Sequence, residues 1–387
     1  MVNDKPKKVA IGCQGGGMHA AFAVGVLTEV LKDEKKQFEL VGLSGTSAGA
    51  LCALMVWYGL APKKKGGQGS AKDAARRLDE FWDRFVAKTG TETLLNMFTF
   101  GALRLEETEV PVLGINAPIL GINPYGAIYK TAAACLPRLG ARQQYFDLEA
   151  MLAEACPEFD DIDWEEVKTR VLIGASEVVN GLETVFDSDV NKKTQKPNEG
   201  MQPKNKIDYW RQRLELSLSG VAASGTLPTF REAERIGRGY YWDGLYSQNP
   251  PVRDFFAGTK VVPDELWIVR INPQQWPEPP ETNGDIQDRQ NELMGNLSLH
   301  KELDFILTVN KWIKNYGGKY KDHHKEVTVR TIKMTKKTAD ELRYSSKFDR
   351  SRDFMDRLRS EGREVGRDWL NSWNANKAKE YPEDAAY

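Results

Sequence analysis

The hydrophobic residues of the chain are grouped in short runs, and the first two runs share one organisation. Residues 8–12 are mostly apolar and of strand length, and a glycine-rich turn joins them to an apolar, helix-length segment that ends near Leu31. Residues 38–43 and 48–57 repeat this arrangement around a second turn, without proline in the helical part. Two successive strand–turn–helix units predict a parallel sheet covered by helices, with both turns at its carboxyl edge.

The remaining pattern extends this α/β fold with a mostly parallel central sheet. Alternating or apolar runs predict further strands at 170–176, 182–186, 239–243, 266–271 and 327–334. Amphipathic or helical spacing predicts helices at 73–85, 210–219, 293–312 and 348–369. The polar segment 187–206 and the proline-rich segment 273–290 are predicted loops.

The pattern favours a single domain over residues 1–387, in which two segments stand apart. Residues 62–166 lose clean periodicity and are interpreted as a cap-like insertion over the carboxyl edge of the sheet; the alternative is an ordinary peripheral insertion. An apolar cluster inside it is expected to form the core of the insertion, and consists of Leu94, Leu95, Met97, Phe98 and Phe100. Residues 335–387 are predicted to form a helical C-terminal extension.

Composition narrows the protein class without naming a function. The chain has 387 residues, 41% hydrophobic and 28% charged, which is an ordinary soluble globular composition. A net charge of −1 and the lack of a basic stripe argue against nucleic-acid binding. The run Lys63 to Lys65 is most simply a solvated loop, with membrane-surface contact as the weaker alternative.

The chain shows no recognisable secretory or membrane-spanning segment, and its cysteines are not paired in sequence. Both observations predict a reducing, cytoplasmic compartment. The apolar run near the N-terminus is too short for a secretory signal, and no apolar stretch is long enough to span a bilayer. Cys13, Cys52, Cys135 and Cys156 form no C-x-x-C pair, so buried free thiols are expected rather than disulfides or metal ligands.

The second turn carries the strongest chemical motif. Gly45-Thr46-Ser47-Ala48-Gly49 fits the G-x-S-x-G nucleophile elbow, and it has the strand–turn–helix setting that this motif requires. Ser47 would stand at the N-terminus of the following helix, where free N–H groups favour a developing oxyanion. The alternative is a turn that merely reverses the chain.

The first turn, Gln14 to Gly17, is a second candidate anion-binding element. Bare backbone N–H groups in such a turn can close on a negative oxygen. The turn lacks the G-K-[ST] ending of a P-loop and the spacing of a dinucleotide fingerprint. One strand–helix unit before the elbow, it is a candidate oxyanion hole.

The base that would activate Ser47 is harder to find. The chain has only four histidines, His19, His300, His323 and His324, and only His19 lies close to a candidate turn. An ordinary Ser-His-Asp triad is therefore disfavoured, and a Ser–Asp dyad in a dry site is the alternative. Asp243 ends an aromatic run before Gly244, where an Asx turn is the simpler interpretation.

Several motifs, in this order along the chain, resemble the patatin-like phospholipase family. The resemblance covers most of the chain and rests on Gln14 to Gly17, Gly45 to Gly49, Gly174 to Ser176, Ala222 to Pro228, Asp243-Gly244 and Asn249-Pro250. It implies a three-layer α/β/α fold and a Ser47–Asp243 dyad. It also implies an oxyanion hole from the backbone of Gly15, Gly16 and Gly17 with help from Ala48, and neither a metal nor a cofactor.

The resemblance implies a lipid acyl hydrolase that acts on phospholipids or other esters through an acyl-enzyme. An acyltransferase, a polyester or simple-ester hydrolase, and a non-catalytic lipid-binding homologue remain alternatives. The expected partners are a lipid or ester substrate and, transiently, a membrane surface; the sequence leaves the oligomeric state open. Under this reading the apolar cluster at 94–100 could instead line an acyl channel. Two departures from the family pattern are noted: His19 and Ala20 replace a basic residue and a glycine, and Leu245 follows Gly244.

Overall fold

The computed structural model describes residues 6–33, 37–107, 140, 142, 145, 147–192, 210–228, 231–256, 261–276, 278–281, 283–317 and 325–383. Within these residues nine strands form one mixed sheet: β1 (Lys7–Cys13), β2 (Phe38–Thr46), β3 (Arg170–Glu177), β4 (Glu183–Asp187), β5 (Arg211–Glu215), β6 (Glu234–Ile236), β7 (Gly239–Asp243), β8 (Glu265–Arg270) and β9 (Thr328–Lys333). The main order is β5-β4-β3-β2-β1-β8-β9, and β7 joins β3 and β6 beside this path.

The centre of the sheet is parallel. Strands β2, β1, β8 and β9 run in one direction, β3 pairs parallel with β2, and the antiparallel pairs β3–β4, β3–β7 and β6–β7 lie toward one edge. Because β1 and β2 are parallel neighbours, the two turns that follow them emerge side by side at the carboxyl edge. This pairing confirms the predicted α/β fold with a mostly parallel sheet.

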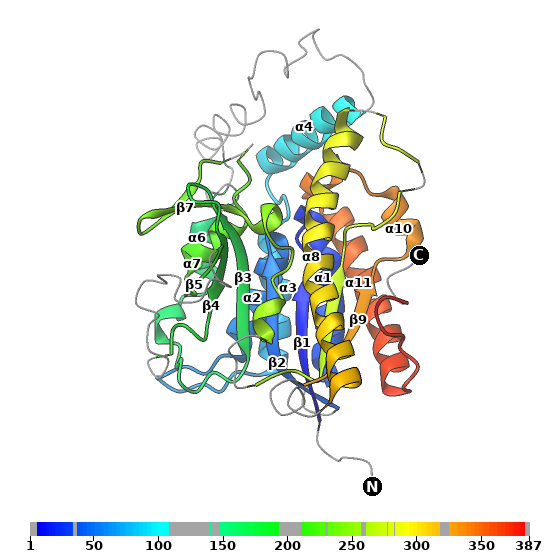
Figure 1. Cartoon of the computed structure of the whole chain (residues 1–387). Helices are drawn as coiled ribbons and strands as arrows, with labels where there is room; N and C mark the ends of the chain where they lie inside the picture. The colour runs from blue at the N-terminus through cyan, green and yellow to red at the C-terminus, as the bar shows by residue number, and fades with distance from the viewer. Residues whose placement is uncertain are drawn as a thin grey trace.

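Helices cover both faces of the sheet (Figure 1). The described helices are α1 (Ala21–Val30), α2 (Ala48–Leu60), α3 (Ala71–Phe85), α4 (Gly90–Glu107), α6 (Leu148–Ala155), α7 (Leu218–Ser224), α8 (Asn283–Tyr316), α10 (Lys336–Glu341) and α11 (Arg352–Asn374). Short 3-10 segments include η1 (Gly17–Ala20), η8 (Gly244–Tyr246) and η10 (Ser345–Phe348).

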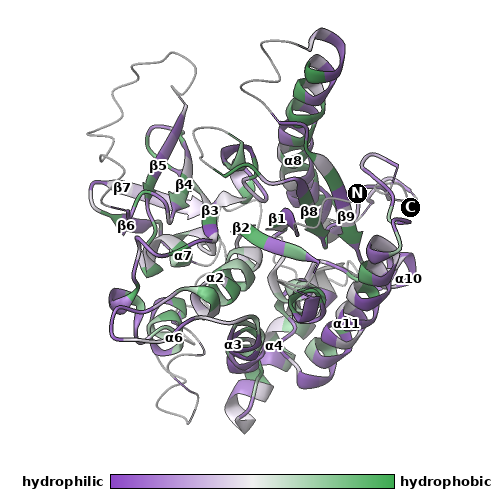
Figure 2. Cartoon of the chain, turned by 90° about the horizontal axis from the view of Figure 1, so that it is seen from below, coloured by the Kyte–Doolittle hydropathy of each residue, from purple (hydrophilic) through white to green (hydrophobic). Residues whose placement is uncertain are grey.

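Alternate residues of the central strands point into two separate cores, as the period of a strand requires. On β1, Val9 and Ile11 face the larger core with α1, α2 and α11, whereas Ala10 faces a smaller core with α8. Seen from below, α2, α3 and α11 lie on one side of β2 and β1, and α8 lies on the other (Figure 2); α1 packs against α11. The arrangement is a three-layer α/β/α fold.

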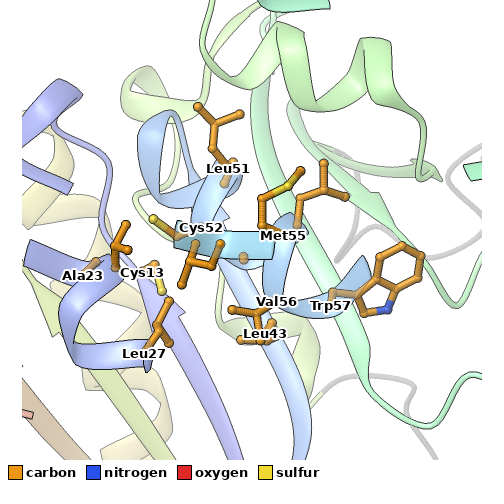
Figure 3. Close-up of a cluster of buried hydrophobic side chains, with 14 of the residues drawn as sticks. Cys13, Ala23, Leu27, Leu43, Leu51, Cys52, Met55, Val56 and Trp57 are labelled. Atoms are coloured by element: carbon orange, nitrogen blue, oxygen red, sulfur yellow. The ribbon is translucent and has the colours of Figure 1, made fainter. Parts of the chain in front are cut away.

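The larger core contains three of the predicted free thiols. Cys13 and Cys52 are buried between α1 and α2 beside Leu27 and Leu43 (Figure 3). Cys156 is also buried and free, while Cys135 lies outside the described residues. Burial in apolar surroundings raises the pKa of the Cys13 thiol to about 12, so this thiol stays protonated and packs as a small hydrophobe.

The structure corrects three predicted elements. Residues 210–219 were expected to be helical, but 211–215 form the strand β5. In this strand Arg211 forms an ion pair with Asp254, and Arg213 forms one with Asp187. The helix comes later, as α7, in the small-residue segment. Helix α8 begins at Asn283 rather than Leu293, so it takes up the end of the predicted loop 273–290.

The division of a single domain into a core, a cap-like insertion at 62–166 and a C-terminal extension stays a prediction. Residues 62–166 contribute α3, α4 and α6, while much of the segment between α4 and α6 lies outside the described residues. Most of the predicted loop 187–206 lies outside them too. The C-terminal extension supplies α11, whose Trp373 donates a buried 2.8 Å hydrogen bond to Glu265 of β8. Among the described helices, none combines the length and apolar character needed to cross a membrane.

Candidate active site

Ser47 occupies a strained turn between β2 and α2. Its backbone φ is 55°, in a region that residues with a side chain rarely adopt, and α2 begins at the next residue. The turn needs its flanking glycines, because a Cβ on Gly45 would lie 2.2 Å from the Gly49 carbonyl oxygen and one on Gly49 would lie 2.2 Å from that of Cys13. The geometry is that of a nucleophile elbow rather than a simple chain reversal.

Ser224, at the end of α7, holds the elbow in place. Its Oγ accepts a 2.9 Å hydrogen bond from Ser47 N–H and donates one of 2.6 Å to the Gly174 carbonyl of β3. Ser224 is fully buried. One hydroxyl thus joins the nucleophile backbone to two neighbouring elements. In the sequence, Ser224 lies within the motif from Ala222 to Pro228, but no local pattern indicates its task.

Gly15 is fixed by two asparagines. Its N–H donates a 2.7 Å hydrogen bond to Asn249 Oδ1, and its carbonyl accepts one of 2.9 Å from Asn272 Nδ2. Gly15 N–H is therefore already committed and is not available to an oxyanion, contrary to the expectation from the sequence. Its role is to fix the glycine turn. No sequence pattern indicated Asn272, which follows β8 and reaches the turn only through the parallel pairing of β1 and β8.

Three other N–H groups at this edge are free to bind an anion. Within the described part of the chain, no acceptor is found for the N–H of Gly16, Gly17 or Ala48. Gly17 has a φ of 57° and starts η1, and Ala48 starts α2, so both stand at helix N-termini. Free N–H groups in such positions favour negative charge.

Asp243 lies at the end of β7, facing the elbow. Its Oδ1 accepts a 2.8 Å hydrogen bond from Leu245 N–H, so the expected Asx turn is present. The turn does not remove the carboxyl group from the site. Burial raises the pKa of Asp243 to about 7, and hydrogen bonding from the Ser47 side chain and Leu245 N–H acts in the opposite direction. A carboxylate with a pKa near neutrality is a better proton acceptor than an exposed aspartate.

Ser47, Asp243 and the glycine turn line one cavity of about 320 Å³. Its apolar wall comes from α2, α3, α4 and α6, and includes Leu51, Phe85, Leu95, Leu148 and Met151. Its polar wall includes Asn249, Asn272, Asn291, Glu292 and Lys347. Such a lining accommodates a ligand with a long apolar part and a compact polar part.

The histidines do not supply a base in the described structure. His19 is buried and its Nε2 lies 2.7 Å from Ser346 Oγ of η10, so this predicted neighbour of the site does not line the cavity. Burial, assisted by the charges of Lys347 and Arg357, holds the pKa of His19 well below its usual value. His300 lies on α8 beside Arg270, and His323 and His324 fall outside the described residues. The described chain also holds no group of three His, Cys, Asp or Glu side chains arranged for a metal.

The apolar cluster at 94–100 divides between two environments, which corrects the expectation of an insertion core. Leu95 lines the cavity, while Leu94, Met97 and Phe98 are 68%, 65% and 60% exposed. The i, i+3 and i+4 spacing of the exposed residues places them on one face of α4. Helix α4 therefore presents one face to the cavity and an apolar face to solvent.

A family model for patatin-like phospholipases matches residues 13–256, more than half of the chain. The chain belongs to the patatin-like phospholipase family. The matched region contains the glycine turn, the elbow, Ser224 and Asp243, and membership places the protein among lipid hydrolases. The family model ends before β8, α8 and η10, which supply much of the polar wall of the cavity.

Two solved structures are similar to this chain at low identity. VipD from Legionella pneumophila is 12% identical, with a TM-score of 0.35, over 92% of this chain and 67% of that one. The type III effector protein ExoU is 14% identical, with a TM-score of 0.30, over 95% of this chain and 53% of that one. This chain thus spans about half the length of ExoU, and scores this low carry no functional argument. A comparison with curated protein sequences found no match.

Proposed function

We propose that this protein is a serine lipid acyl hydrolase that cleaves carboxylic esters through a Ser47–Asp243 dyad. Ser47 attacks the ester carbonyl while Asp243 takes its proton, and the N–H groups of Gly16, Gly17 and Ala48 receive the oxyanion. As the tetrahedral intermediate collapses, Asp243 returns the proton to the leaving oxygen, the alcohol departs, and an acyl group remains on Ser47. A water molecule, deprotonated by Asp243, then releases the fatty acid and restores the serine.

The observation that carries this proposal is the convergence of three elements on one cavity. A strained serine, a fully buried carboxyl group with a raised pKa and unpaired backbone N–H groups come from segments far apart in the sequence. A non-catalytic lipid-binding homologue has no need for the strain at Ser47 or for the burial of Asp243, because each lowers stability without improving binding.

The lining of the cavity supports a substrate with a long apolar part. The apolar wall formed by α2, α3, α4 and α6 suits an acyl chain, and the polar wall suits the alcohol portion of an ester. Phospholipids and simpler acyl esters both meet these requirements.

The exposed face of α4 suggests how a lipid reaches the cavity. Leu94, Met97 and Phe98 form an apolar surface on a helix that also lines the cavity through Leu95 and Thr99. Lipids are held in membranes, so an apolar surface that continues into the cavity wall is suited to transient contact with a bilayer. We include this contact in the proposal, with the α4 face in place of the lysine run at 63–65.

The direct test is the intact mass of the protein after exposure to a long-chain fluorophosphonate. Wild type should gain one adduct, and Ser47→Ala and Asp243→Asn should gain none or gain it far more slowly. Product analysis with an added alcohol then separates hydrolysis from acyl transfer. An adduct on Ser47→Ala, or no adduct on folded wild type in the presence of vesicles, would contradict the proposed dyad.

A further inference from the structure

Helix α8 has a buried face that changes character along its length. In its second half Leu299, Leu303 and Ile306 are buried against the sheet, as expected of a covering helix. In its first half, the buried positions one turn apart are Asp288, Glu292 and Asn296, which are 4%, 4% and 1% exposed. Burying three polar side chains in succession is unfavourable unless each has a partner or a task.

Two of these residues, Asp288 and Asn296, have polar partners that explain their burial. Asp288 forms an ion pair with Lys347 of η10. Asn296 accepts a 2.9 Å hydrogen bond from Gln14 Nε2 and donates one of 3.0 Å to the Pro273 carbonyl, so it supports the glycine turn. Both contacts tie α8 to the edge of the sheet that carries the active site.

Only one of the two carboxyl oxygens of Glu292 has a hydrogen-bond partner among the described residues. Both of its hydrogen bonds reach the same oxygen: Trp276 Nε1 donates to Oε2 at 2.7 Å, and Arg289 donates to Oε2 at 3.3 Å. No partner for Oε1 is found among the described residues, and Glu292 lines the cavity. This deeply buried carboxyl group therefore keeps one oxygen without a partner among the described residues, and its side chain lines the same cavity as Ser47 and Asp243.

The charges around Glu292 decide what it can bind. Lys347 is paired with Asp288, and Arg289 lies beside Glu292 itself, so both of these cations have an acidic partner. The hydrogen-bonding group that Glu292 still offers is one carboxyl oxygen, which suits a neutral hydroxyl group. Burial raises the pKa of Glu292 to about 7, an effect that Lys347 opposes, so both protonation forms are present near neutral pH. A carboxyl group in this state can donate to or accept from a hydroxyl.

We propose that Glu292, together with Asn291, forms a subsite that binds the hydroxyl groups of an uncharged, glycerol-like alcohol portion of the ester. Glu292 and Asn291 come from α8, whereas Leu148 and Met151 of the apolar wall come from α6. Glu292 lies outside residues 13–256, so the subsite is not part of the region shared with the family model. The inference rests on the proposed function, because it takes the cavity as the place where an ester binds.

The test measures binding and does not depend on catalysis. Calorimetry on the full chain compares 1-O-hexylglycerol with hexyl methyl ether, both below their aggregation limits; neither ether can be hydrolysed. Wild type should bind the glycerol ether about tenfold more tightly, as expected for one or two well-placed hydrogen bonds. Glu292→Met, which has a similar shape but no hydrogen-bonding oxygen, should bring the ratio close to one.

Controls address folding and location. Gln290→Ala changes an exposed position on the same helix and should keep the tenfold ratio. If Glu292→Met does not fold, the indole N–H resonance of Trp276 replaces it as a readout, assigned by its loss in Trp276→Phe. In wild type this resonance should shift with the glycerol ether and not with the methyl ether, because Trp276 donates to Glu292.

The outcomes separate this inference from the proposed function. Equal binding of the two ethers by wild type, or an unchanged ratio in folded Glu292→Met, would overturn the subsite even if the fluorophosphonate labels Ser47. A clear preference that is lost in Glu292→Met would support the subsite even if no adduct forms, in which case the dyad would be the part that fails.

Discussion

The two sides of the cavity are built in opposite ways. On the catalytic side, the backbone is held by buried hydrogen bonds: Ser224 fixes the elbow, and Asn249 and Asn272 fix Gly15. On the α4 side, the wall is apolar, and the same helix exposes Leu94, Met97 and Phe98. This difference fits the proposed function, in which the reacting groups must be positioned to a fraction of an ångström. For a wall proposed to receive an acyl chain, apolar contact is sufficient.

The largest effect is expected when the proposed reacting groups on the catalytic side are removed. Ser47→Ala and Asp243→Asn should each lower ester hydrolysis on the order of 10³-fold or more, since one removes the proposed nucleophile and the other removes the carboxylate proposed to take its proton. Asp243→Asn should be at least as stable as wild type in thermal unfolding at pH 8, because it removes a buried charge. Substantial turnover by either folded variant would remove the dyad from consideration.

A smaller loss is expected when the elbow is loosened without touching a reacting group. Ser224→Ala leaves Ser47 N–H and the Gly174 carbonyl without their shared partner. We expect stability to fall by about 1–3 kcal/mol and kcat by about 30-fold through misplacement of Ser47. Chemical denaturation and steady-state kinetics measure the two effects.

Ser219→Ala is the matched control, because Ser219 lies on the same helix and its hydroxyl donates an exposed hydrogen bond to Glu149, away from the elbow. Its stability and kcat should stay close to those of wild type. If the two serine variants behave alike, the bridging role of Ser224 is wrong.

The pH dependence tests whether the buried carboxyl group is the base. The pKa of Asp243 is raised to about 7, and only the ionised form accepts a proton, so activity should be lost as the pH falls through this value. With a single titration, kcat/KM on a water-soluble ester should drop about tenfold for each pH unit well below 7.

Glu292 also titrates near neutrality, because burial raises its pKa to about 7, so it needs a separate control. The inflection should remain in Glu292→Gln if Asp243 is responsible. If the inflection disappears in that variant, the titration belongs to Glu292, and Asp243 is not the base that governs the rate.

The mildest effect is expected on the apolar side. Replacing Leu94, Met97 and Phe98 together by serine should weaken binding to phospholipid vesicles about tenfold and should change hydrolysis of a water-soluble ester far less. Vesicle sedimentation measures the first and steady-state kinetics the second. Val179→Ser, at an exposed apolar residue of the turn after β3, is the control and should bind vesicles as wild type does. Unchanged vesicle binding by the triple variant would show that the α4 face does not contact membranes.

The sequence was sufficient to predict those elements whose conformation depends on neighbouring residues alone. The elbow around Ser47, the glycine turn and the strands at 8–12 and 38–43 each follow from neighbouring residues, because turn sterics and hydrophobic period act over a few positions. Local pattern failed at β5, where Arg211 pairs with Asp254, far along the chain. It also failed at the start of α8, whose buried polar residues conceal its amphipathic period.

What only the tertiary structure decided is which groups are available at the site. The family resemblance implies Gly15, Gly16 and Gly17 as oxyanion donors, chiefly Gly16 and Gly17; in the fold, Asn249 accepts the N–H of Gly15, and those of Gly16 and Gly17 have no acceptor among the described residues. Asp243 is an ordinary turn residue until burial raises its pKa, and Glu292 has no visible role until α8 brings it to the cavity wall. The sequence determined the reacting residue types and their local turns. Their hydrogen-bond partners, charge states and shared cavity depend on contacts between distant segments, which no local pattern encodes.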